Sequence, residues 1–159
     1  MEKVVRHAPR VVKTYPLIWE VAGYPSLVAL QIPPNCDLTL GLVCIDKSVP
    51  GTTVWTMRVD ERFLNPAGLV QGGFLAAMLD SAMGASAVTG AGEHKVSVAN
   101  TEMKISFLRP VRLDAHLTCT ARVLKSGRVI SFLEGRIIDQ DNQVVATASS
   151  SYLIRERPG

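Results

Sequence analysis

The sequence predicts a two-layer α+β domain, in which one apolar helix packs against an antiparallel sheet of five or six strands. The helix is predicted because residues 73–88 are rich in small and apolar side chains and hold a single charge. The strands are predicted because polar and apolar residues alternate with a period of two in the segments that follow. Short turn motifs separate these segments, and such meanders form antiparallel sheets. Packing the helix on one face of the sheet buries both apolar surfaces.

The chain has 159 residues, which suits one domain with one core. Residues 1–35 contain five prolines, so we interpret them as an extension with room for one short helix. Residues 36–159 form the single predicted domain. Within it, Leu38 to Ile45 is a strand or a short helix, and Thr52 to Val59 is a strand rich in threonine, valine and tryptophan after the Pro50-Gly51 turn.

The predicted helix begins near Gly73, after a loop at Asn65-Pro66-Ala67-Gly68, and ends at about Val88, before Gly90 and Gly92. Strands follow it to the end of the domain. We expect them over residues 100–107, 117–123, 129–138 and 144–154. Their ends are marked by Pro110 and by the turns Lys125-Ser126-Gly127-Arg128 and Asp139-Gln140-Asp141-Asn142.

Composition argues against several classes of protein. The net charge is +3 without a run of Lys or Arg, which is short of a nucleic-acid-binding footprint. The chain has an odd number of cysteines, Cys36, Cys44 and Cys119, and none has CxxC spacing. This argues against a disulfide framework and against a zinc site, and it favours a reducing cytoplasm. No apolar run follows Met1–Arg10, so no signal peptide is expected, and the Gly-, Ala- and Ser-rich stretch Gly72–Gly92 suits protein packing better than lipid.

Asp80 is the most informative single residue. It lies in the middle of an otherwise uncharged helix, with no cation one turn away. A buried carboxylate there must be compensated, either by a functional role or by structural hydrogen bonds. The alternative is an exposed Asp80 on a polar stripe with Ser81 and Thr89.

The helix entry Gln71-Gly72-Gly73 leaves backbone N–H groups free at the positive end of the helix, which suits an oxyanion. The alternative is close packing at an ordinary helix start. Asn65 offers an amide that could orient a carbonyl or a water, although turn residues of this type are common. The three histidines, His7, His94 and His116, have no partner at metal or triad spacing, and there is no G-x-S-x-G, Walker or dinucleotide motif.

In this order and spacing, these motifs resemble a known family. The chain resembles hotdog thioesterases of the phenylacetate-degradation type. The resemblance lies in the run Asn65-Pro66-x-Gly68-x-x-Gln71-Gly72-Gly73, followed by Asp80 and then by Phe107-Leu108-Arg109-Pro110. The resemblance covers residues 38–154. It implies a five- or six-stranded antiparallel sheet wrapped around the central helix, and sites formed between two subunits of a dimer or tetramer.

The resemblance also implies roles for the site residues. Asp80 corresponds to the nucleophile or general base, an N–H of Gly72 or Gly73 to the oxyanion donor, and Asn65 to the loop asparagine. A polar strand residue of the partner subunit falls near Asn100 or Thr101. The commonest family motif has histidine where this chain has Gln71; an amide can hold a carbonyl or a water but cannot shuttle a proton.

The implied substrate is an acyl-CoA, so coenzyme A is part of the substrate and no separate cofactor or metal is expected. Its phosphates would be bound near strand ends and turns, by cations at Arg109, Arg112, Lys125 and Arg128 together with Ser126 and Gly127. Ordinary solvated charge is the alternative for each cation. We expect no nucleic-acid or membrane partner.

Three functions are compatible with these motifs to different degrees. The first is hydrolysis of an acyl-CoA, with Asp80 as base or nucleophile. The second is a non-catalytic acyl-CoA-binding protein of the same fold, which would not need Asp80. The third is a hydratase or dehydratase, which is disfavoured because no histidine lies near the helix.

Overall fold

The computed structural model describes residues 33–157. The predicted extension over residues 1–35, with its short helix, lies outside this range apart from its last three residues. The described elements are, in chain order, α1 (Asn35–Leu40), β1 (Val43–Asp46), β2 (Thr52–Arg58), the 3-10 helix η1 (Glu61–Phe63), α2 (Gly72–Gly90), β3 (Val96–Phe107), β4 (His116–Ser126), β5 (Ile130–Ile138) and β6 (Val144–Glu156).

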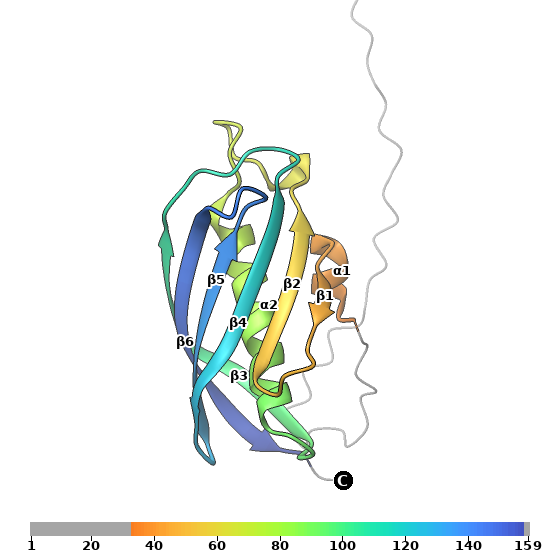
Figure 1. Cartoon of the computed structure of the whole chain (residues 1–159), viewed down its shortest axis with the longest axis vertical. Helices are drawn as coiled ribbons and strands as arrows, with labels where there is room; N and C mark the ends of the chain where they lie inside the picture. The colour runs from red at the N-terminus through yellow and green to blue at the C-terminus, as the bar shows by residue number, and fades with distance from the viewer. Residues whose placement is uncertain (1–32, 158–159) are drawn as a thin grey trace, which may run out of the picture.

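The six strands form one antiparallel sheet in the order β1-β2-β4-β5-β6-β3. The long helix α2 lies along one face of this sheet, and its axis follows the strands (Figure 1). It contacts β2, β3, β4, β5 and β6. The predicted α+β fold, with one central helix and a curled antiparallel sheet, is confirmed.

The core lies between α2 and the sheet. The helix contributes fully buried Met78, Leu79 and Met83, and β2 turns Trp55 and Met57 toward it. This follows from the sequence, because alternate residues of a strand face the same side and the helix is apolar around most of its circumference. A methyl group on Gly135 of β5 would lie 2.9 Å from Leu79 Cδ2, so glycine lets the helix approach the sheet closely.

Strand β3 differs from the expected pattern. It begins at Val96 rather than near residue 100, and its pairing with β6 shifts between Asn100 and Glu102, where Asn100 lies opposite Tyr152 and Glu102 opposite Ser151. The regular alternation predicted Asn100 and Glu102 on one polar face. The β-bulge instead turns Asn100 to the helix side, the side to which Tyr152 belongs.

Other boundaries differ by a few residues. The expected turn at 125–128 is displaced, because β4 continues to Ser126 and the chain reverses over residues 127–129, closed by Gly127 N donating to Ile130 O at 2.8 Å. The segment from Leu38 to Ile45 contains both predicted alternatives, the end of α1 and the start of β1.

A hydrogen bond links helix α1 to α2. Ser81 Oγ donates to Asp37 Oδ1 at 2.7 Å, and Asp37 is buried. All three cysteines are free thiols, and burial raises the pKa of Cys119 to about 12. Between residues 33 and 157, no helix is long and apolar enough to cross a membrane.

Candidate active site

A pocket of about 670 Å³ opens at the N-terminal end of α2. It brings together several of the residues that the sequence singled out: Asn65, Gln71, Gly72, Gly73 and Arg109. Its apolar walls come from the neighbouring loop, the first turns of α2 and the end of β3: Leu69, Val70, Leu75, Ala76, Phe107, Leu108, Pro110 and Val111. The pocket therefore joins polar groups at the helix start to an apolar surface.

The first turn of α2 supplies free hydrogen-bond donors to this pocket. Within residues 33–157, neither Gly72 N nor Gly73 N has a hydrogen-bond acceptor, as expected for the first amides of a helix. A Cβ at Gly72 would lie 2.9 Å from Phe107 Cζ, so the Phe107 ring packs directly on this glycine. These amides can stabilise negative charge on an oxygen that enters the pocket.

Gln71 occupies the N-cap position of α2, yet its side chain makes no capping hydrogen bond. Its backbone is fixed instead, because Gln71 N donates to Phe63 O at 2.8 Å and Phe74 N donates to Gln71 O at 3.0 Å. The side chain is exposed at the pocket. Its amide is therefore available to a ligand.

Asn65 organises the loop before the helix. Its Oδ1 accepts hydrogen bonds from Ala67 N at 2.9 Å and Leu69 N at 3.2 Å. This is the turn role that the sequence allowed as the alternative. The amide nitrogen of Asn65 makes no hydrogen bond to a described residue, so one end of the side chain holds the loop and the other remains free at the pocket wall.

Asp80 lies two helical turns beyond Gly73 and outside this pocket. In the single chain its side chain is exposed, which was one of the alternatives, but it is not free. Asn100 Nδ2 donates to Asp80 Oδ1 at 2.6 Å, and the Tyr152 hydroxyl donates to the same oxygen at 2.5 Å. A carboxylate held by two donors on one oxygen keeps a second oxygen for chemistry.

The two candidates for the polar strand residue have different surroundings. Asn100 contacts Asp80 of its own chain, whereas Thr101 Oγ1 is engaged with Ser151, at 2.9 Å from its carbonyl oxygen and 2.8 Å from its Oγ. Tyr152 was missed by the sequence reading. The sequence signal that could have identified Tyr152 is its inward-facing position in the last strand. The hydroxyl of a buried tyrosine needs a hydrogen-bond partner.

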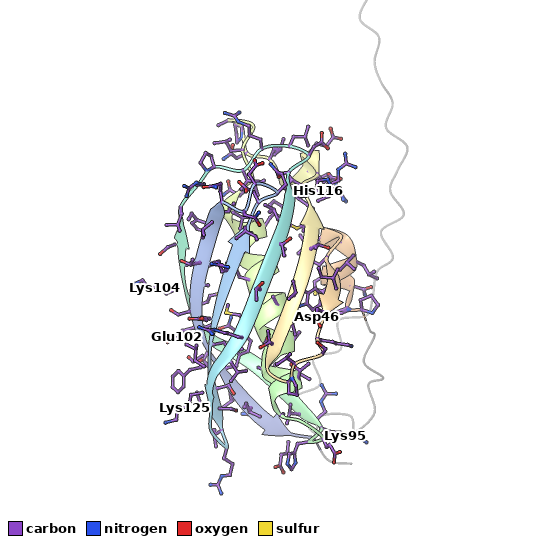
Figure 2. The ribbon with its side chains drawn as sticks, viewed as in Figure 1. Asp46, Lys95, Glu102, Lys104, His116 and Lys125 are labelled. Atoms are coloured by element: carbon purple, nitrogen blue, oxygen red, sulfur yellow. The ribbon has the colours of Figure 1, made fainter. Side chains whose placement is uncertain are left out.

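The four predicted CoA-binding cations do not gather within one chain. Arg109 lines the pocket of the helix start, and Arg112 lies a few residues further along the same connection. Lys125 and Arg128, with Ser126 and Gly127, lie where β4 reverses into β5, at the opposite end of the sheet. Figure 2 shows His116 and Lys125 at the two ends of β4.

The site offers two kinds of chemical group, a pair of helix amides without acceptors and a hydrogen-bonded carboxylate. No group of three or more His, Cys, Asp or Glu side chains in residues 33–157 is arranged to hold a metal ion. Addition of an oxygen nucleophile to a carbonyl carbon is accelerated by groups of both kinds.

Comparisons with known proteins agree on one family. The model of the thioesterase superfamily matches residues 67–146, the half of the chain that contains the glycine pair and Asp80. Human acyl-coenzyme A thioesterase 13 is 31% identical over 99 residues, which cover 62% of this chain and 69% of that protein.

Solved structures show the same fold. The PaaI protein of the E. coli phenylacetic acid degradation operon superposes with a TM-score of 0.69 at 27% identity, covering 78% of this chain and 84% of that one. A phenylacetic acid degradation-related protein of Ralstonia eutropha gives 0.68 at 35% identity, covering 76% and 89%. With its hotdog sheet and central helix, the chain belongs to the thioesterase superfamily and is a thioester hydrolase.

Proposed function

We propose that this protein hydrolyses an acyl-CoA to a free acid and coenzyme A. The observation that carries the proposal is the presence on one helix of unpaired first-turn amides at Gly72 and Gly73 and of a hydrogen-bonded carboxylate at Asp80. The relatives that are named acyl-coenzyme A thioesterases support a CoA thioester as the substrate class.

The thioester carbonyl oxygen accepts hydrogen bonds from the Gly72 or Gly73 amide, while Asp80 takes a proton from the attacking water or attacks the carbonyl carbon itself. A C–O bond forms and the C–S bond breaks, and the sulfur leaves as the CoA thiolate, which then receives a proton. If Asp80 attacks, the resulting acyl-enzyme anhydride is cleaved by water in a second step. Gln71 holds the carbonyl or the water through its amide.

The proposed site requires a second copy of the chain. Two helical turns separate the glycine pair from Asp80, whereas both must approach one carbonyl carbon. An antiparallel pairing of two α2 helices brings Asp80 of one subunit to the glycines of the other. The protein therefore acts as a dimer, or as a tetramer built from such dimers.

The substrate brings coenzyme A with it, so no separate cofactor is required. Arg109, at the pocket mouth, is suited to a phosphate of the nucleotide, and its guanidinium is steadied by the Val144 carbonyl at 3.3 Å. The apolar walls next to the glycines suit the acyl chain or the pantetheine arm. Three free thiols fit the reducing cytoplasm as the place of action.

The proposal is tested by replacing Asp80 with asparagine. Asp80→Asn keeps the shape of the side chain and removes the base or nucleophile, so turnover of acyl-CoAs should fall about 10²- to 10⁴-fold with an unchanged melting temperature. Asp141→Asn, a change at an exposed turn, is the control and should keep the parent rate.

A panel of short, long and aromatic acyl-CoAs identifies the substrate for this comparison. If Asp80→Asn hydrolyses the best substrate at the parent rate, the assigned mechanism is wrong. If the parent protein binds acyl-CoA stoichiometrically without turnover, the non-catalytic binding function replaces the proposal.

A further inference from the structure

Tyr152 reaches the candidate carboxylate from beneath the helix. It lies on β6, is 2% exposed, and its hydroxyl donates to Asp80 Oδ1 at 2.5 Å while lying 3.0 Å from the backbone oxygen of Asp80. Its ring packs on α2 where Gly84 has no side chain: a Cβ there would lie 3.6 Å from Tyr152 Cε1. The ring is therefore fixed between strand and helix with its hydroxyl directed at Asp80.

Asn100 supplies the second donor to the same oxygen, and its orientation is fixed. Asp80 Oδ1 can only accept a hydrogen bond, so Nδ2 of Asn100 faces it, at 2.6 Å, and lies 3.3 Å from the Tyr152 hydroxyl. Oδ1 of Asn100 then faces Ser150 Oγ at 3.1 Å, whose single proton is shared with the Glu102 carbonyl at 2.6 Å. The β-bulge after Asn100 creates this arrangement by turning the side chain to the helix face. Two strands thus converge on one carboxylate oxygen.

The two oxygens of Asp80 are consequently different. Oδ1 accepts both hydrogen bonds, whereas Oδ2 has no hydrogen-bond partner in residues 33–157. A carboxylate that is free to rotate would present both oxygens equally. Fixing one of them selects a single side-chain rotamer and directs the other oxygen away from the sheet, toward the exposed side of α2.

The Tyr152 hydroxyl remains a donor across the neutral range. Burial raises the pKa of Tyr152 far above its usual value, and the hydrogen bond to Asp80 and the negative charge there raise it further. The hydrogen bond from Tyr152 to Asp80 Oδ1 is therefore kept throughout that range.

We propose that Tyr152, assisted by Asn100, is the positioning residue of Asp80: it holds Oδ1 so that Oδ2 meets the water or the thioester carbon. The inference rests on the proposed function of Asp80. It assigns Tyr152 no contact with substrate, so the residue acts on the rate of the chemical step and not on substrate binding.

The experiment is Tyr152→Phe in the full-length protein, with acyl-CoA hydrolysis measured by thiol release. This change keeps the ring and removes the hydroxyl. We expect kcat to fall about 10- to 100-fold, as for the loss of a hydrogen bond to a charged group, and KM to change less than about twofold. In an Asp80→Asn background the same change should cause no further loss of kcat, because the group that it positions is already gone.

The matched control is Thr53→Val, which also removes a buried hydroxyl that binds α2. Thr53 Oγ1 donates to Ala82 O at 2.9 Å and accepts from Trp55 Nε1 at 3.0 Å, and it makes no contact with Asp80. The control should lower the melting temperature and keep kcat. It separates a general loss of packing from the positioning effect.

A parent-like kcat in Tyr152→Phe, or an equal loss of kcat with and without Asp80, would overturn this inference while leaving the proposed function intact. Parent-like turnover by Asp80→Asn would instead remove the proposed function, and this inference with it. If Tyr152→Phe does not fold, Asn100→Ala on the edge strand β3 is the second test. A lower kcat at constant KM supports the positioning of Asp80. A raised KM at constant kcat overturns the inference in favour of substrate binding.

Discussion

Gly73 and Asp80 lie seven residues apart on the same face of α2, and about 10 Å of helix separates them along the axis. Both are exposed in the single chain, and the small residue Ala77 lies between them on the same face. A second helix can approach such a surface closely. Under the proposed mechanism, this spacing holds the amides and the carboxylate of one chain too far apart to act on one carbonyl carbon.

Subunit mixing tests this relationship. Asp80→Asn and Gly73→Val homo-oligomers should each be nearly inactive, because the first lacks the carboxylate and the side chain introduced in the second blocks the approach to the glycine amides at every site. Random mixing after unfolding and refolding gives dimers that are half heterodimers, each with one intact site, so about a quarter of the parent activity should return. No recovery in a mixture that has demonstrably exchanged subunits would place both functions of a site on one chain.

Gln71 gives a prediction that separates binding from capping. Gln71→Ala should slow turnover about 2- to 13-fold, the effect of one hydrogen bond to a neutral group. Its melting temperature should not change, because the side chain makes no capping bond. Gln71→His should stay active and add a pH dependence near the ordinary histidine pKa of about 6.5. A Gln71→Ala enzyme as inactive as Asp80→Asn would contradict the supporting role.

The two glycines at the helix start should respond differently to alanine. A Cβ at Gly73 meets no atom within 4 Å, so Gly73→Ala should raise the free energy of unfolding by about 0.4–1 kcal/mol through the unfolded chain. The same methyl group enters the pocket where a thioester must approach, so kcat/KM should fall on the order of tenfold or more. Unchanged kcat/KM in this variant would place the substrate elsewhere.

Gly72→Ala is the companion variant. Its Cβ would lie 2.9 Å from Phe107 Cζ, and because Phe107 is half exposed the ring can move aside. We expect little change in melting temperature and an altered preference for acyl chain length, since Phe107 forms a pocket wall. The preference is measured with the same panel of acyl-CoAs.

The fold class follows from local sequence patterns, because a helix whose only charge is Asp80 and strands of period two bury their apolar faces by packing on each other. The sequence also marked Gly72, Gly73 and Asp80, since helix amides and an isolated carboxylate are visible as local patterns. The short α1 was ambiguous, because a six-residue helix carries too few turns for a period to be recognised.

The hydrogen-bond donors that hold Asp80 depend on contacts between segments far apart in the chain. The regular alternation of residues 100–107 predicted Asn100 on the polar face, and one extra residue in β3 reversed it. Bulges arise from pairing between distant strands, which local sequence does not encode. Tyr152 is 72 residues from Asp80 in the chain, so their contact exists only because β6 crosses beneath α2. The structure likewise shows that Gly73 and Asp80 are both exposed on α2, which the sequence pattern alone left open.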